Sequence, residues 1–265
     1  MVYDTTGKSH KEGVANEHTF VERCNNPDGI ICRYIRVKYG VTALVEHKGG
    51  TRTVDDAVIM NDSVKVVGIS IKRHKCGTFD WLNTSKLTDK DTLCVNINGF
   101  RERNRGITKD MWENNEKTLR AECATLFDNY LNTITSENIV TILGNIYKDY
   151  CDEIAIVDIG NNRTIMYPKA ENFNEMIGYP MWRYYLNRTR AKNSAVIWRE
   201  YKGVQLSTNL RIRITLNNGV TALLGLSSAN KNSCVCLKVQ QDNVRGYINS
   251  LRNTVIENHE RVSVV

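Results

Sequence analysis

The stretch 54-VDDAVIMNDSVKVVGISIKRHKCGTFDW-81 contains two apolar runs separated by Asn61-Asp62. Neighbouring Asn and Asp residues between two such runs are typical of a tight turn, so the stretch predicts two antiparallel strands. Charged side chains interrupt both strands: Asp55 and Asp56 lie near the start of the first, and Lys72 ends the second. Buried strands seldom carry unpaired charge, so these side chains are candidates for a functional site.

Ser70 and Lys72 are two residues apart, and side chains alternate along a strand, so both face the same side of the sheet. The preceding antiparallel strand brings one of the two aspartates beside them. The length of the turn decides which one, because a slip of one residue exchanges the two faces of a strand. The registers left open pair Asp55 with Gly68, for a two-residue loop, or Asp56 with Val66, for a three-residue loop.

Residues 12–25, EGVANEHTFVERCN, predict a helix that precedes the strands. Val14, Val21 and Cys24 fall on one face of a helix with 3.6 residues per turn. Glu17 lies on the same face, three residues after Val14 and four before Val21. The helix therefore presents a carboxylate on the face that we expect to pack against the sheet.

The remainder of the chain predicts an α/β fold in which helices flank a central mixed β-sheet. Residues 109–150 have a helical pattern, and we expect a closing helix over about 243–258. Further strands are expected at 31–38, 41–46, 54–60, 64–72, 153–158, 163–167, 194–201, 210–216, 220–226 and 234–240.

The charge balance favours a polyanionic partner. The formal net charge is +7 and the sequence pI is about 8.9, and a basic surface gains affinity for nucleic acid through counterion release. No apolar run has the length of a membrane helix, and the polar start lacks the core of a signal peptide. We therefore expect a cytoplasmic protein with no membrane partner; the family resemblance described below implies a bacterial or virus-infected host cell.

Common catalytic and metal-binding motifs are missing from the sequence. There is no phosphate-binding glycine loop, no H-E-x-x-H and no dinucleotide-binding glycine run. Cys234 and Cys236 form a C-x-C pair, but no further ligands occur at a zinc spacing, so free thiols are expected. The remaining chemistry is a set of carboxylates and a lysine, which suits Mg²⁺-assisted hydrolysis of phosphodiesters.

Two segments carry a resemblance to a known family. The pattern D…S-x-K of Asp56, Ser70 and Lys72 resembles the PD-(D/E)xK nuclease superfamily, which has an acid on one strand and acid-x-lysine on the next. The stretch 7–26 resembles the first helix of small type II restriction endonucleases that cut tetranucleotide sites such as GCGC. Its K-x-G-x-x-N-E pattern is matched by Lys11, Gly13, Asn16 and Glu17.

This resemblance covers residues 7–26 and 54–82 clearly, and residues from 210 to about 239 weakly. It implies a restriction-endonuclease-like fold and Mg²⁺-dependent cleavage of DNA at a short double-stranded sequence. Ser70 departs from the family, which has Glu, Asp or Gln at that position. The implied roles are Mg²⁺ ligation by Asp56, Glu17 and the main-chain carbonyl of Ile71, charge stabilisation or water orientation by Lys72, weak assistance by Ser70, and Asp55 in reserve.

Basic residues elsewhere are candidates for DNA contact. Trp81 has two interpretations, a core residue or an aromatic wedge that stacks between base steps. Arg211, Arg213, Lys238 and Gln240 alternate on late strands and are candidates for reading base edges. The candidates for phosphate contact are Arg73, Lys75, Arg101, Arg103, Arg105, Arg188 and Arg190.

We therefore expect one nuclease domain with three segments. Residues 1–100 form the catalytic core with its first helix, 101–192 a largely helical insertion, and 193–265 a strand-rich, DNA-contacting part with the last helix. The alternatives are a nicking, mismatch or junction nuclease of the same superfamily, and a catalytically inactive DNA-binding relative. Monomer and homodimer are both compatible with the sequence.

Overall fold

The computed structural model describes residues 8–48, 55–75, 77–83, 90–149, 151–177, 182–216, 218–227 and 235–259. Val54 and Cys234, which belong to expected strands, lie outside these residues. The chain divides into two compact units, which are described one at a time. The first unit comprises 1–79, 146–178 and 243–265, and the second comprises 80–145 and 179–242. The division into three segments expected from the sequence stays a prediction.

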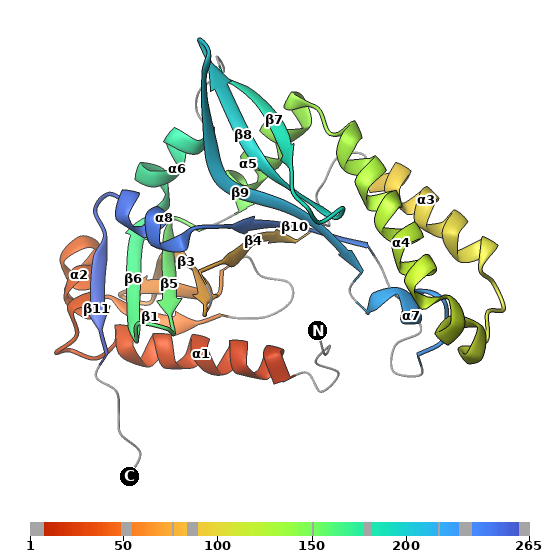
Figure 1. Cartoon of the computed structure of the whole chain (residues 1–265). Coiled ribbons are helices and arrows are strands. Elements are labelled where there is room, and N and C mark those ends of the chain that lie inside the picture. Colours follow the sequence, from red (N-terminus) through yellow and green to blue (C-terminus); the bar gives the residue numbers. More distant parts are fainter. Residues whose placement is uncertain are drawn as a thin grey trace. The chain divides into compact units, whose positions relative to one another are not determined.

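The first unit is built on a six-stranded mixed sheet with the strand order β1-β2-β3-β5-β6-β11 (Figure 1). Strands β3 and β5 are parallel, and the other neighbours are antiparallel. The strand bounds are β1 (Leu44–His47), β2 (Ala57–Asn61), β3 (Val64–His74), β5 (Glu153–Asp158), β6 (Arg163–Pro168) and β11 (Val255–Asn258). The mixed α/β class expected from the sequence is confirmed.

Helices α1 (Lys8–Cys24) and α2 (Ile30–Tyr39) cover one face of this sheet. Phe20 and Cys24 of α1, with Ile31 and Ile35 of α2, pack into one buried cluster with the strands. Burial of these apolar side chains is the main source of stability for such a layer. The strand members of the cluster are Val45, Ala57, Ile59, Val67, Ile69, Ala155 and Met166.

The strand expected at 31–38 was wrong, because this segment is α2. Ile31, Cys32 and Ile35 are its buried residues, and their spacing places them on one face of a helix. The helix ends at Gly40, whose φ of +122° is a conformation that favours glycine. The β-branched residues of this segment suggested a strand, but burial of one helical face decides its structure.

The turn between β2 and β3 also differs from the expectation. Asp62 and Ser63 form it, with φ values of +50° and +66°, so the two-residue loop lies one position later than predicted. A bulge between Ile59 and Met60 then shifts the register and pairs Ala57 with Ile69. Neither of the two expected registers is correct, because the turn lies one position later and the bulge, which the sequence pattern does not reveal, adds a further shift.

The second unit contains an antiparallel sheet with the strand order β4-β10-β9-β8-β7, in which β4 lies at one edge next to β10. Helices α3 and α4 of this unit contact each other. The bounds are β4 (Phe79–Asn83), β7 (Arg183–Arg188), β8 (Ser194–Tyr201), β9 (Val204–Leu216), β10 (Val235–Gln241), α3 (Lys90–Arg103), α4 (Lys109–Thr133), α5 (Ser136–Asp149), α6 (Lys169–Ile177) and α7 (Gly219–Leu223). The last residues of α5, from Ile146, belong to the first unit, and α6 lies wholly within that unit.

Two further expectations for the last third of the chain were wrong. Residues 220–226 do not form a strand, since α7 begins there at Gly219, which has a φ of +76°. The expected closing helix is only the short α8 (Val244–Ser250). Asn253 has a φ of +53°, and the chain then continues as β11, which pairs with β6. Pairing with a sheet edge therefore replaces the second half of the helix.

Within the described part of the chain, no helix is both long and apolar enough to cross a membrane.

Candidate active site

The centre of the candidate site is the carboxylate of Asp56, just before β2. Its Oδ2 accepts a hydrogen bond of 2.6 Å from the main-chain N–H of Ile71 and one of 3.3 Å from Oγ of Ser70. The N–H of Asp56 donates to the carbonyl of Ile69 at 3.0 Å, which continues the β2–β3 pairing. Asp56, rather than Asp55, is therefore the aspartate that lies beside Ser70.

Asp55 has different partners. It forms an ion pair with Lys65, and Sγ of Cys151 donates a hydrogen bond to its Oδ1 at 3.0 Å. Burial raises the pKa of Asp55, but the hydrogen bonds from Cys151 and Lys65 outweigh burial and leave this pKa below its usual value. Its carboxylate also fills the space above Gly68, where a Cβ would approach Oδ1 to 2.5 Å. These contacts point to a structural role for Asp55.

The electrostatic environment of Asp56 ties it to Lys72 and Glu17. Burial raises the pKa of Asp56 above its ordinary value, and the ammonium group of Lys72 opposes this effect. The carboxylate of Glu17 adds to the rise, since two nearby negative charges disfavour each other. The helix α1, the residue before β2 and the strand β3 thus bring Glu17, Asp56 and Lys72 close enough to affect the pKa of Asp56.

His47 is a member of this neighbourhood that the sequence did not reveal. Its Nε2 lies 2.9 Å from Oε2 of Glu17, and its ring lies 4.1 Å from the ring of His18 between centroids. Strand pairing places His47 opposite Ala57, the residue after Asp56. The spacing of His47 in the sequence gives no metal-binding signal, because its proximity to Glu17 arises only when α1 packs on β1.

The described residues offer too few ligands for a metal ion held by protein side chains alone, but they suit Mg²⁺, which keeps water and substrate ligands. Mg²⁺ is commonly bound by one or two carboxylates, with water and substrate phosphates as the remaining ligands. Asp56 and Glu17 supply two carboxylates whose mutual repulsion a cation would relieve. Within the described ranges, no group of three or more His, Cys, Asp and Glu side chains has the arrangement of a metal site. The third predicted ligand is the carbonyl of Ile71, whose N–H holds Asp56.

Two predicted phosphate-contacting residues follow Lys72 in the first unit. Arg73 is the penultimate residue of β3, and its Nη1 lies 3.3 Å from Oε2 of Glu12. Lys75 is exposed just beyond the end of β3 and lines a cavity. Arg73 therefore has an acidic partner on α1, whereas Lys75 faces an open space.

Trp81 lies in the core of the second unit. Its side chain is only 2% exposed, and its Nε1 donates a hydrogen bond of 3.2 Å to Oε1 of Gln241. A wedge between base steps needs an exposed ring. The prediction of Trp81 as a DNA-contacting residue is therefore wrong for this structure, and the core interpretation agrees with it. The residue lies on the edge strand β4, and its indole N–H finds a partner on the neighbouring strand β10.

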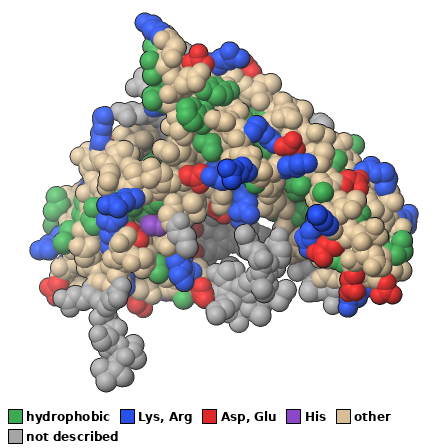
Figure 2. All heavy atoms as spheres, viewed as in Figure 1, with side chains coloured by type: hydrophobic (Ala, Val, Ile, Leu, Met, Phe, Trp, Pro, Cys, Tyr) green, Lys and Arg blue, Asp and Glu red, His purple; other side chains and the backbone are tan. Residues whose placement is uncertain are grey.

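The four residues predicted to read base edges do lie together. Arg213 pairs across the sheet with Lys238, and Arg211 pairs with Gln240. Acidic partners hold three of them: Asp80 accepts hydrogen bonds from Lys238 at 3.0 Å and Gln240 at 2.7 Å, and Asp242 lies 2.8 Å from Arg211. Figure 2 shows Lys and Arg side chains next to acidic ones over β9 and β10. We call Arg211, Arg213, Lys238 and Gln240 the basic strand face.

The other predicted phosphate-contacting arginines lie elsewhere in the second unit, on α3, just after it, and at the end of β7. Arg103 pairs with Glu122 at 2.7 Å, and Arg188 pairs with Asp128. Burial lowers the pKa of Arg188. The exposed members of the set are Arg101, Arg103, Arg105 and Arg190.

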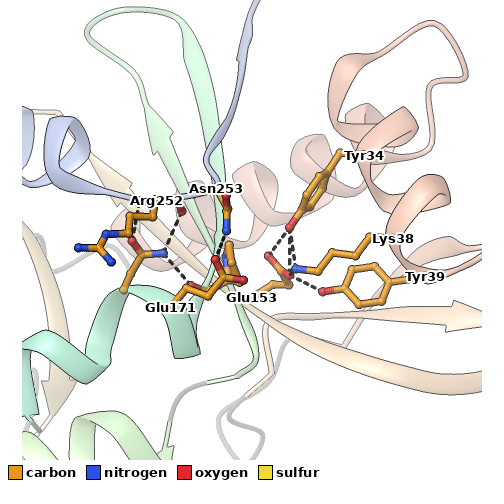
Figure 3. A network of polar contacts seen from close by, with 9 residues as sticks. Tyr34, Lys38, Tyr39, Glu153, Glu171, Arg252 and Asn253 are labelled. Carbon is orange, nitrogen blue, oxygen red and sulfur yellow. Dashed lines mark hydrogen bonds and ion pairs between the residues drawn. The ribbon is translucent and has the colours of Figure 1, made fainter.

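A buried carboxylate on the first strand after the helical region was also missed. Glu153 is fully buried, and Lys38 donates to it at 2.6 Å, Tyr34 at 3.2 Å, and Tyr39 at close range. Figure 3 shows the three side chains of α2 pointing toward Glu153. Burial lowers the pKa of Lys38, but its hydrogen bonds to Glu153 and Tyr34 outweigh burial and raise it. This network joins α2 to β5 and has the character of a structural contact.

Comparison with protein-family models, curated proteins and solved structures finds no match to this chain.

Proposed function

We propose that the chain is a Mg²⁺-dependent type II restriction endonuclease, which hydrolyses phosphodiester bonds within a short specific sequence of double-stranded DNA. The observation that carries the proposal is the convergence of Asp56, Ser70 and Lys72 on two neighbouring strands, with Glu17 of α1 close enough to raise the pKa of Asp56. The resemblance of residues 7–26 and 54–82 to small restriction endonucleases, and with it a restriction-endonuclease-like fold, belongs to the same proposal.

In the proposed reaction, the oxygen of a water molecule bonds to phosphorus, one P–O bond of the DNA breaks, and the departing oxygen takes up a proton. Negative charge grows on the phosphate, and the ammonium group of Lys72 stabilises that charge or orients the water. The N–H of Ile71 and the hydroxyl of Ser70 hold the carboxylate of Asp56 in place. Mg²⁺, held by Asp56, Glu17 and the carbonyl of Ile71, would activate the water.

The experiment is digestion of a mixed-sequence plasmid with Mg²⁺, for the wild type and the Lys72→Ala variant. Discrete fragments support a restriction endonuclease, and open circles alone support a nickase of the same superfamily. Lys72→Ala should abolish cleavage and leave DNA binding in a gel shift largely intact. The matched control is Lys65→Ala. Lys65 lies on the same strand as Lys72, but its ion pair is with Asp55 and not with Asp56. Retained cleavage by Lys72→Ala would exclude the proposed site.

A second candidate is a DNA-binding protein without nuclease activity. Ser70 favours it, because a hydroxyl is a weaker Mg²⁺ ligand than the carboxylate usual at this position in the superfamily. This candidate predicts a gel shift with no cleavage at any Mg²⁺ concentration. The Ser70→Glu variant separates the two: it should strengthen cleavage in an active nuclease, and it should leave a binding protein inactive.

A further inference from the structure

A polar cavity of about 620 Å³ lies in the first unit, where the parallel strands β3 and β5 end. Its size falls in the range of small-ligand pockets. His74 and Lys75 line it from the end of β3, Arg163 from β6, and Arg245 from α8. Figure 2 shows Lys and Arg side chains around a histidine on the face over this part of the unit.

The cavity has an excess of positive charge. Lys75, Arg163 and Arg245 contribute three cations, and Asp158 contributes one carboxylate. That carboxylate is already engaged, because it accepts hydrogen bonds from Nε of Arg163 at 2.9 Å and from Nδ2 of Asn161 at 2.7 Å. Burial raises the pKa of Asp158, but its hydrogen bonds outweigh burial and keep this pKa low. Among the described residues, Lys75 and Arg245 therefore have no carboxylate partner in the lining.

His74 adds a buried donor that lacks a hydrogen bond. Its side chain is 8% exposed, and neither ring nitrogen has a hydrogen-bond partner among the described residues. Nε2 lies 3.5 Å from Oδ1 of Asp158, which is beyond a good hydrogen bond. Buried polar groups normally find partners, so this ring is an unsatisfied group behind the wall of the cavity, with both nitrogens shielded from solvent.

We propose that this pocket binds a phosphate group. A phosphate offers several oxygen acceptors, which suits the two arginines and the lysine in the lining of the pocket. Guanidinium groups match phosphate oxygens in a two-pronged geometry, so the arginines favour phosphate over a smaller anion. Most of the residues that line the pocket are polar or charged, and Ile248 is the large apolar side chain among them.

The position of the pocket suggests the source of the phosphate. His74 follows Lys72 by two residues on β3, so the two side chains project from the same face of the sheet. If the chain is the nuclease proposed above, the pocket holds a backbone phosphate near the bond that is cleaved. This assignment of the source rests on the proposed function, whereas phosphate binding itself does not.

The first experiment is calorimetric titration of the full chain with inorganic phosphate in EDTA, so that no cleavage occurs. Lys75→Gln combined with Arg245→Gln should weaken binding about tenfold or more, because each substitution removes a charge-assisted contact. Both side chains are exposed, so the variant should fold. The control is Arg33→Gln with Lys202→Gln, which removes two exposed charges elsewhere and should change affinity less than about twofold.

The second experiment asks whether a DNA duplex or a 5′-mononucleotide displaces the phosphate, again in EDTA. Displacement by the duplex that is lost in Lys75→Gln with Arg245→Gln identifies the DNA backbone. Displacement by the mononucleotide alone identifies a free phosphate ester and separates the pocket from the nuclease. Absence of saturable phosphate binding, or equal affinity in the wild type and the double variant, overturns the proposal whether or not the chain cuts DNA.

Discussion

The main-chain N–H of Ile71 donates a hydrogen bond of 2.6 Å to Oδ2 of Asp56. This contact fixes the carboxylate of one strand against the backbone of the next, one residue before Lys72. A carboxylate in this place is costly, because burial raises its pKa and Glu17 adds a second negative charge nearby. Functional sites commonly contain such groups at the expense of stability.

The first prediction concerns the stability of Asp56→Asn as a function of pH. The folded-state pKa of Asp56 is raised, so ionisation of this carboxyl destabilises the folded state. The protonated carboxyl contributes stability at low pH, and that contribution is lost as pH rises through the folded-state pKa. At pH 7 the variant, which cannot ionise and still offers a carbonyl to Ile71, should melt at a higher temperature than the wild type. The difference should vanish at about pH 4 and below, near the pKa of an unfolded Asp.

Asp55→Asn is the matched comparison and has the opposite sign. The folded-state pKa of Asp55 is lowered, so its stability contribution is present above the unfolded pKa and is lost as pH falls through the folded pKa. The variant should therefore be less stable at pH 7, by about 1 kcal/mol because Lys65 is half exposed. Equal melting behaviour of the two variants across pH would contradict the assignment of Asp56 to the site.

The second prediction concerns Mg²⁺. A cation that binds only the folded state stabilises it by about 2.7 kcal/mol at 100 times its dissociation constant. For a chain of this size that amounts to a rise of roughly 5–10 °C in the melting temperature. The wild type and Asp55→Asn should show the rise, and Asp56→Asn should not. Differential scanning fluorimetry with Mg²⁺ and with EDTA measures it, and an equal rise in all three proteins would place the cation elsewhere.

The sequence predicted those parts of the site that depend on local pattern. The face of α1 that carries Glu17 and the common face of Ser70 and Lys72 follow from the periods of helix and strand. The choice between Asp55 and Asp56 did not follow, since a bulge at Ile59 changes the register, and a bulge leaves no mark in the alternation of apolar residues.

Residues that depend on tertiary packing were missed for a related reason. His47 meets Glu17 only because α1 contacts β1, and Glu153 meets Lys38 only because α2 packs against the sheet. Segment 31–38 looked like a strand because its isoleucines are β-branched, although its buried face has helical spacing. Local preference is a weak signal where burial of one face decides the structure.

The third prediction concerns the basic strand face of the second unit. Asp80 holds Lys238 and Gln240, so in the proposed DNA complex it would compete with DNA for both side chains. Asp80→Asn should raise DNA affinity up to about tenfold and steepen the salt dependence by about one unit, as one more cation releases a counterion. Asp110→Asn removes an equal charge from the exposed start of α4 and serves as the control. An equal effect of both variants in a binding titration would show that net charge, and not the contacts of Asp80, explains the change in affinity.

The fourth prediction concerns Trp81. Because its side chain is buried, Trp81→Ala should lower the free energy of unfolding by about 3–5 kcal/mol, measured by urea denaturation. Trp81→Phe keeps an aromatic ring but removes the indole N–H that donates to Oε1 of Gln241. The free energy of unfolding should therefore fall by about 1–3 kcal/mol. Folded Trp81→Phe should bind DNA as the wild type does. Full stability of Trp81→Ala together with weakened DNA binding would instead support the interpretation of Trp81 as a wedge between base steps.

The fifth prediction concerns the pair Lys38 and Glu153. Lys38→Met leaves a fully buried carboxylate with two tyrosine hydroxyls and no cation, which should cost about 3–5 kcal/mol. Glu153→Leu in addition removes the stranded charge, so the double variant should recover most of that loss. Chemical denaturation of the wild type, both single variants and the double variant completes the cycle. If the two losses simply add, the ion pair is not what joins α2 to β5.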